Sequence, residues 1–514
     1  MPTARARSAF LATTVGFALA ACGCRAPIAT NAVRANVAAS LGSQTDEKPS
    51  PVRPSPLSRH RGETIERVHY SEDSPPAQPD EAIPLEAPHR DEAGELSLEE
   101  TIDVAWAANP DLVSASQQVA LAEATLARAR AEFFPKLGFS ENYMVSNNPV
   151  NAFTYQLNQA QLSLMQDFNN PGTLDDFDTQ LRLEHRLYAG GRRSHQVHAA
   201  DAQVAAGAFH LETVRNQLVL RVAEAYYRLL QARDLVKVRE EAVAQVEQHL
   251  EIVESRFRNE SAVKSDVLTV EVRLAEVREA LITAENQLQL AWVLLSNVVG
   301  TRVGPRPLPA NIPPAPWQDH VTQVQAAVDE ALDARPEIHA FANRRQAASE
   351  QLLVAETGKR PDVDLVADYD VHTGDFRAGN DSFFVGVVFR LNLLDGGRTR
   401  AEIRQAEARL REIEAREQRL MLDIELDVHR AYLQLNEAQA RLKVTEQAVV
   451  QAQESLREIE VRYRGQAAPI TELVDSQVAL SDARVRRTNA MADLEIARVA
   501  LEAAMGRLAV AIAY

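Results

Sequence analysis

Few side chains in this sequence are spaced in a way that would support chemistry. His195 and His198 lie three positions apart, which on a helix would bring two imidazoles to one face, as in many metal sites. No Cys, Asp or Glu is spaced to complete the ligand set, so we expect surface histidines and no metal. The chain also has no glycine-rich phosphate loop, nucleophile motif or catalytic dyad. The sequence therefore predicts neither a cofactor nor an enzyme activity.

The first residues of the chain indicate export and attachment to lipid. A short basic region precedes the apolar run 9–21, which is too short to span a bilayer and has the form of a signal peptide. The run leads into Leu-Ala-Ala-Cys at Cys22, a pattern similar to a bacterial lipoprotein cleavage site. We expect removal of residues 1–21 and lipidation of Cys22; a plain signal peptide with an incidental cysteine is the alternative. Cys24 is the only other cysteine, so the body can hold no disulfide framework.

The composition of the 514 residues excludes several classes of protein. Aromatic residues make up only 5%, and Ala, Leu, Glu, Gln and Arg dominate the long middle stretches, as in extended helices. A net charge of −17 argues against a nucleic-acid partner, which would need a basic face. Residues 22–94 hold ten of the 24 prolines and are rich in Ser, Glu and Asp. Such a stretch cannot bury a core, so it predicts an extended tether.

The remaining chain contains one structural unit twice. Residues 95–300 and 327–508 form the two copies, a proline-rich connector joins them at 301–326, and a short tail follows at 509–514. From the first glycine pair onward the copies keep an offset of 206 residues without gaps. The matched positions are Gly190-Gly191 with Gly396-Gly397, Ala225-Tyr226 with Ala431-Tyr432, Arg256-Phe257 with Arg462-Tyr463, and Gly300 with Gly506. An offset kept over this length indicates duplication of a whole structural unit.

Each copy predicts one long helix and two shorter ones. The long helix of the first copy runs from Arg193 to about Phe257, roughly 100 Å at ~1.5 Å per residue. Leu98–Glu132, which a proline breaks or kinks, and Ser265–Val299 are each about half as long. Two half-length helices stacked end to end would match the long one. Heptad steps predict coiled-coil packing toward one end, with Val243, Val246, Leu250, Val253 and Phe257 in the core.

Alternating runs within 134–188 and 361–394 predict two pairs of strands, each of about ten residues, the length of a tilted membrane-spanning strand. A polar loop joins the first pair. One face of the strands is apolar and the other carries charges, namely Arg182, Arg186, Arg390, Asp362, Asp364, Asp368 and Asp370. No spare segment is left to cover the apolar face, which favours a barrel with these charges toward a wet, cation-preferring lumen. Four strands cannot close a barrel, since the smallest have about eight, so the chain must oligomerise. Soluble amphipathic hairpins are the alternative.

These features together resemble the TolC-like outer-membrane efflux proteins across residues 96–510. The resemblance rests on two junctions in which a strand, a Gly-Gly-Arg sequence and a long helix follow one another, on two helical tips, and on the duplication. The lipid-attachment pattern and the proline-rich tether match the lipidated branch of that family. The family implies a mixed α+β chain whose long helices form a coiled-coil barrel. Three chains would contribute four strands each to one 12-stranded transmembrane β-barrel.

The resemblance also implies a function and partners. The homotrimer would be a passive exit duct of a tripartite efflux or type I secretion system, in the outer membrane of a Gram-negative bacterium and extending into the periplasm. Its partners would be outer-membrane lipid, a periplasmic adaptor of the membrane-fusion class and an inner-membrane transporter. A lipid-tethered periplasmic coiled-coil adaptor or structural protein, without a pore, is the alternative. Two strand pairs of membrane length, each joined directly to a long helix, favour the duct.

The resemblance places a periplasmic gate at the second tip. Glu472 and Asp475 lie at i and i+3 of the helix that follows, so three chains would form two carboxylate rings that favour cations. The same alignment brings Tyr463 near Ser265 and Asp266, and we expect a Tyr463–Asp266 hydrogen bond that latches the two helical pairs. The alternatives are a solvated helix face for the carboxylates and a purely packing role for Tyr463.

The tips also depart from the family. Glu260 and Gln466 stand where glycine is common, so the geometry of the tips and the choice of adaptor can differ here.

Overall fold

The computed structural model describes residues 94–163, 165, 167, 169–316, 323–374 and 380–508, all within one compact unit, Leu85–Tyr514. The expected signal peptide, the tether up to residue 93, Cys22 and the tail at 509–514 lie outside these residues. None of the described helices combines the length and the hydropathy needed to cross a bilayer.

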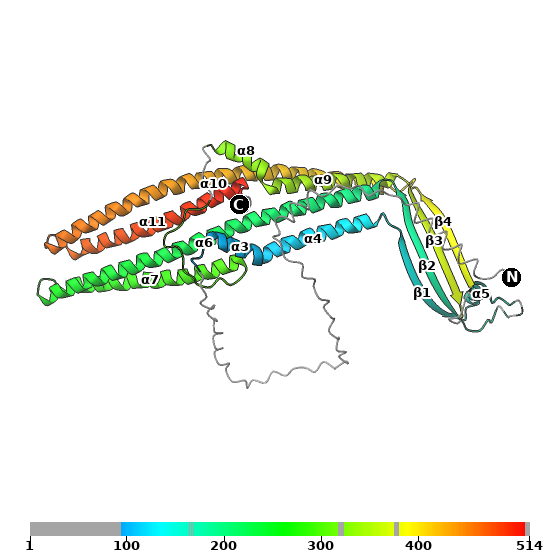
Figure 1. Ribbon diagram of the computed structural model, residues 1–514, viewed down its shortest axis with the longest axis horizontal. Helices are drawn as coiled ribbons and strands as arrows, with labels where there is room; N and C mark the ends of the chain where they lie inside the picture. The colour runs from blue at the N-terminus through cyan, green and yellow to red at the C-terminus, as the bar shows by residue number, and fades with distance from the viewer. Residues whose placement is uncertain are drawn as a thin grey trace, which may run out of the picture. The chain divides into compact units, whose positions relative to one another are not determined.

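Four antiparallel strands form one sheet in the order β1-β2-β3-β4 (Figure 1). The strands are β1 (Lys136–Ser146), β2 (Leu174–Ala189), β3 (Asp362–Thr373) and β4 (Asn380–Arg390). The pair β2–β3 joins the two copies of the repeat, and it contains a bulge between Arg186 and Tyr188. The outer strands β1 and β4 are exposed along nearly their whole length, because each has one unpaired edge. The four predicted strands are therefore confirmed.

The long helices are α6 (Arg192–Arg258) and α10 (Arg398–Arg464), of 67 residues each. A tip turn follows each, and the chain returns as α7 (Lys264–Val299) and α11 (Ile470–Met505), of 36 residues each. All four helices keep the offset of 206 residues at both ends. The helical hairpins predicted by the duplication are confirmed, with bounds within a few residues of those expected.

The shorter helices are divided by proline, as predicted. In the first copy α3 (Leu98–Ala108) ends at Asn109, whose side chain caps α4 (Pro110–Ala131) through the amide of Asp111. In the second copy α8 (Val324–Ala334) and α9 (Pro336–Glu356) are divided at Arg335. Proline suits the first position of a helix, because it has no N–H to satisfy there.

The end-to-end stacking of short helices rests on two glycines. Gly300 ends α7 with φ +88°, and a Cβ there would lie 2.7 Å from Cδ of Pro110 and 2.8 Å from Cα of Asn109. Gly506 ends α11 with φ +80°, where a Cβ would lie 3.2 Å from Cα of Arg335. The end of α7 therefore abuts the start of α4, and the end of α11 abuts the start of α9 (Figure 1).

The order of the helices follows the order of the strands. Nearest the sheet, α4 packs on α6, α6 on α9, and α9 on α10. Nearer the tips, α7 packs on α6, α6 on α11, and α11 on α10. The long helices α6 and α10 run through both layers. Among the described helices, the layer nearest the sheet ends in α4 and α10, and the layer nearer the tips ends in α7 and α10.

Three apolar clusters hold these layers together. The largest surrounds Tyr226, whose buried hydroxyl donates to the carbonyl of Leu96 at 2.9 Å. Burial raises the pKa of Tyr226 to about 12, so the hydroxyl stays neutral. The connector packs onto the same cluster: Ala315 is buried, and its amide donates to Oε2 of Glu495 at 2.6 Å. The connector thus lies against the helices over residues 303–315.

Two details differ from the sequence prediction. The polar loop between β1 and β2 contains a helix, α5 (Pro149–Asn158), which the side chain of Asn148 caps. The heptad core near the first tip includes Val246 and Val253, both buried, but Phe257 is 43% exposed. Its counterpart Tyr463 is 8% exposed and belongs to the third cluster. The copies therefore differ in which tip side chain is buried.

Candidate functional site

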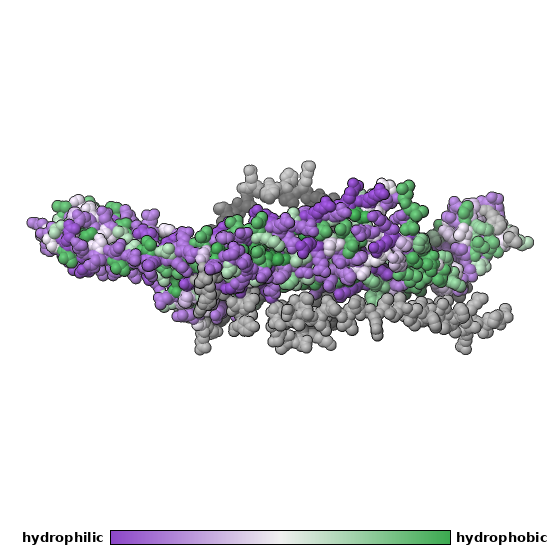
Figure 2. Space-filling model, turned by 90° about the horizontal axis from the view of Figure 1, so that it is seen from above, coloured by the Kyte–Doolittle hydropathy of each residue, from purple (hydrophilic) through white to green (hydrophobic). Residues whose placement is uncertain are grey.

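The sheet has one charged and one apolar face, as the alternation predicts. The cross-strand register brings all seven predicted charged residues to one face: Arg182, Arg186, Arg390, Asp362, Asp364, Asp368 and Asp370. The opposite face is apolar and exposed, with Phe139 70%, Phe383 74% and Val385 63% exposed. Figure 2 shows green, hydrophobic side chains gathered where the long helices end and the strands begin, while purple dominates the helices.

The charges on the polar face are largely paired across the strands. Nε of Arg182 donates to Asp368 at 2.6 Å, and Nε of Arg186 donates to Asp364 at 2.9 Å. Arg390 also donates to Asp364. Asp370 accepts a hydrogen bond from the neutral amide of Gln180 at 2.8 Å. The three arginines therefore offset part of the carboxylate charge on this face.

A second polar cluster, which the sequence analysis did not anticipate, lies near α5. Asp176 is 1% exposed; its carboxylate contacts Nδ1 of His372 at 2.9 Å and accepts from Nε2 of Gln159 at 2.9 Å. Gln159 caps the end of α5, so the cluster ties that helix to β2 and β3. No sequence pattern indicates this contact, because the pairing of Asp176 with His372 follows only from the register of the sheet.

The predicted strand–helix junctions are built from glycines in the left-handed region. Gly190 and Gly396 have φ +61° and +64°, and Gly191 and Gly397, each preceding a long helix, have φ +90° and +88°. L side chains rarely adopt these angles, which is the physical reason for glycine. The sequence therefore identifies both junctions correctly as turns between a strand and a helix.

The two junctions are closed differently. At the second, the carboxylate of Asp395 accepts from the hydroxyl and amide of Thr399 and from the amide of Gly397, and these bonds lower the pKa of Asp395 to about 2. At the first, buried Ala189 occupies the equivalent position, and Nη1 of Arg360 donates to the carbonyl of Gly190 at 2.6 Å. At the position of Asp395, the first junction thus has no carboxylate to accept from the start of its helix.

Both helical tips form the same hydrogen-bonded turn. At the first, the amide of Ser261 donates to Arg256 O at 2.8 Å and the amide of Glu260 to Phe257 O at 3.0 Å; at the second, the bonds recur between the residues 206 positions on. This is a Schellman turn, which needs one left-handed residue. That residue is Glu260 in one copy, at φ +58°, and Gln466 in the other, at φ +60°.

Tyr463 lies between the two hairpins. The guanidinium of Arg256 stacks over its ring at 4.5 Å and donates to the carbonyl of Tyr463 at 3.1 Å. Burial raises the pKa of the Tyr463 hydroxyl, and nearby Asp266 contributes in the same direction. Among the described residues Tyr463 and Asp266 form no hydrogen bond, so the predicted latch is not made in this conformation. Arg256 and Tyr463 instead join the two hairpins at the tips, a contact that the sequence analysis did not identify.

The other gate candidates lie on the surface of the tips. Asp475 and Ser265 are exposed, and Glu472 is partly exposed. Nη1 of Arg462 lies 3.5 Å from the Glu472 carboxylate, within the same hairpin. A single chain therefore presents these groups to solvent and leaves their role in a gate as a prediction.

His195 and His198 have a third neighbour that the sequence did not suggest. Glu350, on α9, lies with Oε2 2.7 Å from Nδ1 of His195 and 3.8 Å from Nδ1 of His198. The expectation that no carboxylate completes this pair is therefore wrong, because Glu350 is brought there from 152 or more residues away by the packing of α9 on α6.

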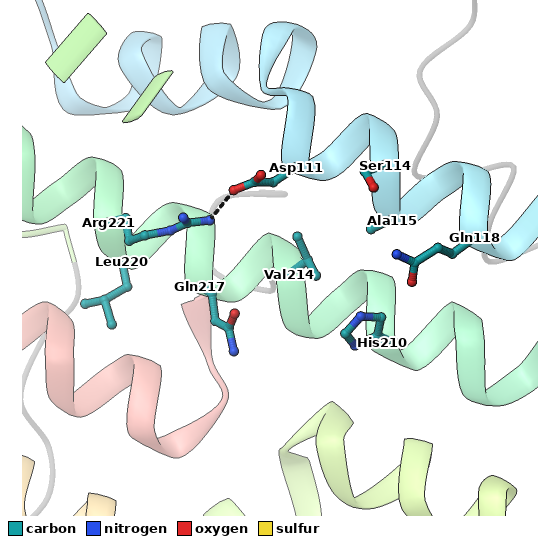
Figure 3. Close-up of a pocket in the computed structure, with 9 residues that line it drawn as sticks. All are labelled: Asp111, Ser114, Ala115, Gln118, His210, Val214, Gln217, Leu220 and Arg221. Carbon is teal, nitrogen blue, oxygen red and sulfur yellow. Dashed lines mark hydrogen bonds and ion pairs between the residues drawn. The ribbon is translucent and has the colours of Figure 1, made fainter. Parts of the chain in front are cut away.

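A surface groove of about 480 Å³ lies between α4 and α6. Figure 3 shows its lining, in which Nη2 of Arg221 lies 3.1 Å from the Asp111 carboxylate and His210 lies further along the groove. One paired carboxylate and a single imidazole offer no set of groups for a reaction. The groove is a seam between two helices.

Comparison with known proteins agrees with this architecture. The model of the family described as outer membrane efflux protein matches residues 101–301 and 327–507, the two copies of the repeat. The chain belongs to the outer membrane efflux protein family. It is 24% identical over 429 residues to the outer membrane efflux protein BepC of Brucella suis, covering 81% of this chain and 87% of that one. It is 23% identical to TolC of Vibrio cholerae, covering 80% and 91%.

Solved structures show the same fold. VceC of Vibrio cholerae superposes with a TM-score of 0.66 at 23% identity, covering 80% of this chain and 96% of that one. CusC superposes with a TM-score of 0.69 at 18% identity, covering 80% and 92%. The predicted fold class, outer-membrane localisation and place among efflux channels are confirmed for this member of the outer membrane efflux protein family.

Proposed function

We propose that three copies of this chain form the exit duct of a tripartite efflux or secretion system, with a periplasmic adaptor and an inner-membrane transporter as partners. The observation that carries this proposal is that each layer of the described unit ends in free edges. The sheet ends in β1 and β4, the layer next to it in α4 and α10, and the layer near the tips in α7 and α10.

The helix α10 has apolar side chains on two opposite faces. Ile424, Val428 and Leu435 are buried against the chain itself. Leu422, Leu426 and Leu433, two positions earlier in each case, are 58%, 51% and 64% exposed. Two residues correspond to about 200° around a helix, so the exposed stripe points away from the buried one. A helix in a closed ring needs such faces, because it contacts a neighbour on each side.

The edge helix α7 repeats this arrangement. Val270 and Leu274 are buried, while Val272 and Ile282 are 61% and 58% exposed. A head-to-tail contact that joins the α10 edge of one copy to the α4 and α7 edges of the next closes into a ring if the rotation per copy is right. The same rotation joins β4 of one copy to β1 of the next, and three copies then supply 12 strands, enough for a barrel.

The polar face of the sheet would line the lumen of this duct. An apolar face with Phe139 and Phe383 exposed suits hydrocarbon, whereas charged residues suit water. The aspartates at 362, 364, 368 and 370, partly offset by Arg182, Arg186 and Arg390, would give the barrel a preference for cations. Passive conduction needs no chemistry, so we expect neither enzymatic turnover nor a cofactor for conduction.

At the periplasmic tips we propose the gate. Glu472 and Asp475 from three copies would form two acidic rings, and Tyr463, Asp266 and Ser265 would hold the inner hairpins against the outer ones at rest. Arg256 already joins the hairpins of one copy through Tyr463, which supports a latch at this level. Cys22 would carry the lipid that attaches the N-terminus to the outer membrane.

The experiment that tests the duct is to measure the mass and the conductance of the protein purified from outer membranes. Light scattering in detergent should give three chains per particle. In planar bilayers with a salt gradient, the reversal potential of single channels should indicate selectivity for cations. The double variant Tyr463→Phe with Asp266→Ala should raise the conductance of the closed duct if the latch holds. A soluble monomer after removal of the lipid would contradict the proposal of a trimeric duct. Anion selectivity would contradict a lumen lined by the aspartates. An unchanged conductance in the double variant would contradict a latch formed by Tyr463 and Asp266.

A further inference from the structure

We infer that His195, His198 and Glu350 form a binding site for a divalent transition-metal ion, next to the first strand–helix junction. One ligand atom from each residue lies within 4.8 Å of the other two. Two imidazoles and one carboxylate are a common ligand set for zinc, and they also suit nickel and copper, whereas magnesium and calcium prefer oxygen ligands alone.

The geometry of the three side chains is close to that of a loaded site. A tetrahedral zinc ion with bonds of ~2.0–2.2 Å holds its ligand atoms roughly 3.4 Å apart. The atoms of His195 and Glu350 are 2.7 Å apart, and those of His198 and Glu350 are 3.8 Å apart. Small rotations of these side chains would bring all three to bonding distance of one ion, without movement of the helices.

The surroundings support binding and leave a route for the ion. The side chains of His195 and Glu350 are 26% and 18% exposed, which places the carboxylate in a half-buried setting between α6 and α9. His198 is 59% exposed, so the ion can enter from solvent and keep water in its fourth position. The guanidinium of Arg360, at the adjoining junction, is engaged with the carbonyl of Gly190.

The consequence of binding would be mechanical. His195 and His198 belong to α6 in the first copy of the repeat, and Glu350 belongs to α9 in the second. An ion held by all three would join the two copies close to where β2 continues into α6. Because it would bind only the folded arrangement, it would also raise the thermal stability of the protein.

The test uses the full chain, purified without a histidine tag, stripped with EDTA and titrated with zinc by calorimetry. The wild type should bind one zinc ion per chain at this site. His198→Gln and Glu350→Gln should each weaken the affinity tenfold or more, and zinc should raise the melting temperature of the wild type but not of these variants. Cobalt in place of zinc should give the visible absorption of a tetrahedral site with nitrogen and oxygen ligands.

The matched control is His249→Gln on the same helix. His249 also lies beside a carboxylate, Glu460, at 3.7 Å, but within the described residues it has no third potential ligand. Zinc affinity should be unchanged in this variant. Equal zinc binding by the wild type and His198→Gln would overturn the proposal and leave only a His195–Glu350 hydrogen bond. Since His198 is mostly exposed, its substitution decides the question even if Glu350→Gln fails to fold.

Discussion

At the scale of single residues, the two tips hold non-glycine residues in a conformation that suits glycine. Glu260 and Gln466 have φ near +60°, which costs an L residue about 1–2 kcal/mol, partly offset by the lower chain entropy of a non-glycine residue when unfolded. We predict that Glu260→Gly and Gln466→Gly each stabilise their tip by ~0.5–1 kcal/mol. Hydrogen exchange at the amides of Ser261 and Ala467, which close the two turns, should slow by roughly two- to fivefold.

The control for this prediction is Asn259→Gly, one position before Glu260. Asn259 has φ −93°, so glycine relieves no strain there and adds only flexibility to the unfolded chain. Exchange at Ser261 should therefore stay the same or become faster. Slowing of the same size in Asn259→Gly would show that the effect does not come from the left-handed angle.

A second prediction at this scale concerns Asp395 at the start of α10. Its pKa is lowered to about 2 by its bonds to Thr399 and Gly397, below the ordinary value of 3.8. A carboxyl with a lowered pKa stabilises the folded junction fully above its ordinary pKa, and the contribution is lost as the pH falls toward the folded value. Protection of the Thr399 amide from hydrogen exchange, corrected for intrinsic rates, should therefore decrease between about pH 4 and pH 2.

The first junction supplies the comparison within the same molecule. Ala189 occupies the position equivalent to Asp395, so the amide of Arg193 should show no decrease over this range. Asp395→Asn should abolish the pH dependence at Thr399, because an amide accepts hydrogen bonds without titrating. A persistent decrease in Asp395→Asn would assign the titration to another carboxyl.

At the scale of elements, the stacking of α7 on α4 depends on the missing side chain of Gly300. We predict that Gly300→Ala lowers the free energy of unfolding by about 2–4 kcal/mol, because it combines a left-handed angle with a clash against Asn109 and Pro110. The measurement is the temperature at which the purified oligomer dissociates and unfolds.

Gly397→Ala is the matched control, because it separates the angle from the clash. Gly397 has the same φ of +88°, but nothing lies within 4 Å of its added Cβ. The control should lose only about 1–2 kcal/mol, the contribution of the angle. Equal losses of unfolding free energy in the two variants would mean that the stacked helices move apart at no energetic cost, so that the clash contributes nothing.

Most helices and strands could be predicted from the sequence, because each sequence pattern occurs in both copies of the repeat and can be checked in one against the other. The offset of 206 residues fixed the matching helices, and the glycine pairs fixed both junctions. The helix α5 was missed because a ten-residue helix within a polar loop has little apolar periodicity. The bulge between Arg186 and Tyr188 was missed because it depends on pairing with β3, which no local pattern records.

Less of the candidate site could be predicted from the sequence, because its contacts join residues that are far apart in the chain. Alternation was enough to place the seven charges on one face, but not to pair Arg186 with Asp364. The stacking of Arg256 on Tyr463 follows from the packing of α6 against α11, which brings the ends of the two hairpins together. Glu350 reaches His195 through the packing of α9 on α6. Heptad spacing predicts a core position for both Phe257 and Tyr463, whereas of the two Tyr463 is buried and Phe257 is exposed.

At the scale of the whole molecule, the duplication gives layers whose inner elements have neighbours on both sides, and the described layers end in β1, β4, α4, α7 and α10. Each copy of the repeat supplies a strand pair, a helical hairpin and two shorter helices in the same order. The contacts between the two copies, β2 with β3 and α6 with α9 and α11, are internal versions of the contact needed between chains. The edges α4, α7 and α10 should therefore meet in a similar way between chains.

The final prediction tests this arrangement at the exposed stripe of α10. Leu422→Glu with Leu426→Glu places two charges on a face that the ring would bury, so the trimer should dissociate to monomers in detergent, as measured by light scattering. Gln434→Glu adds a charge at an exposed polar position of the same helix and should leave the trimer intact. Both variants should keep the helical circular dichroism of the wild type, because Ile424 and Val428 still pack within the chain. A trimer that survives both charges would exclude the α10 stripe as the contact between copies.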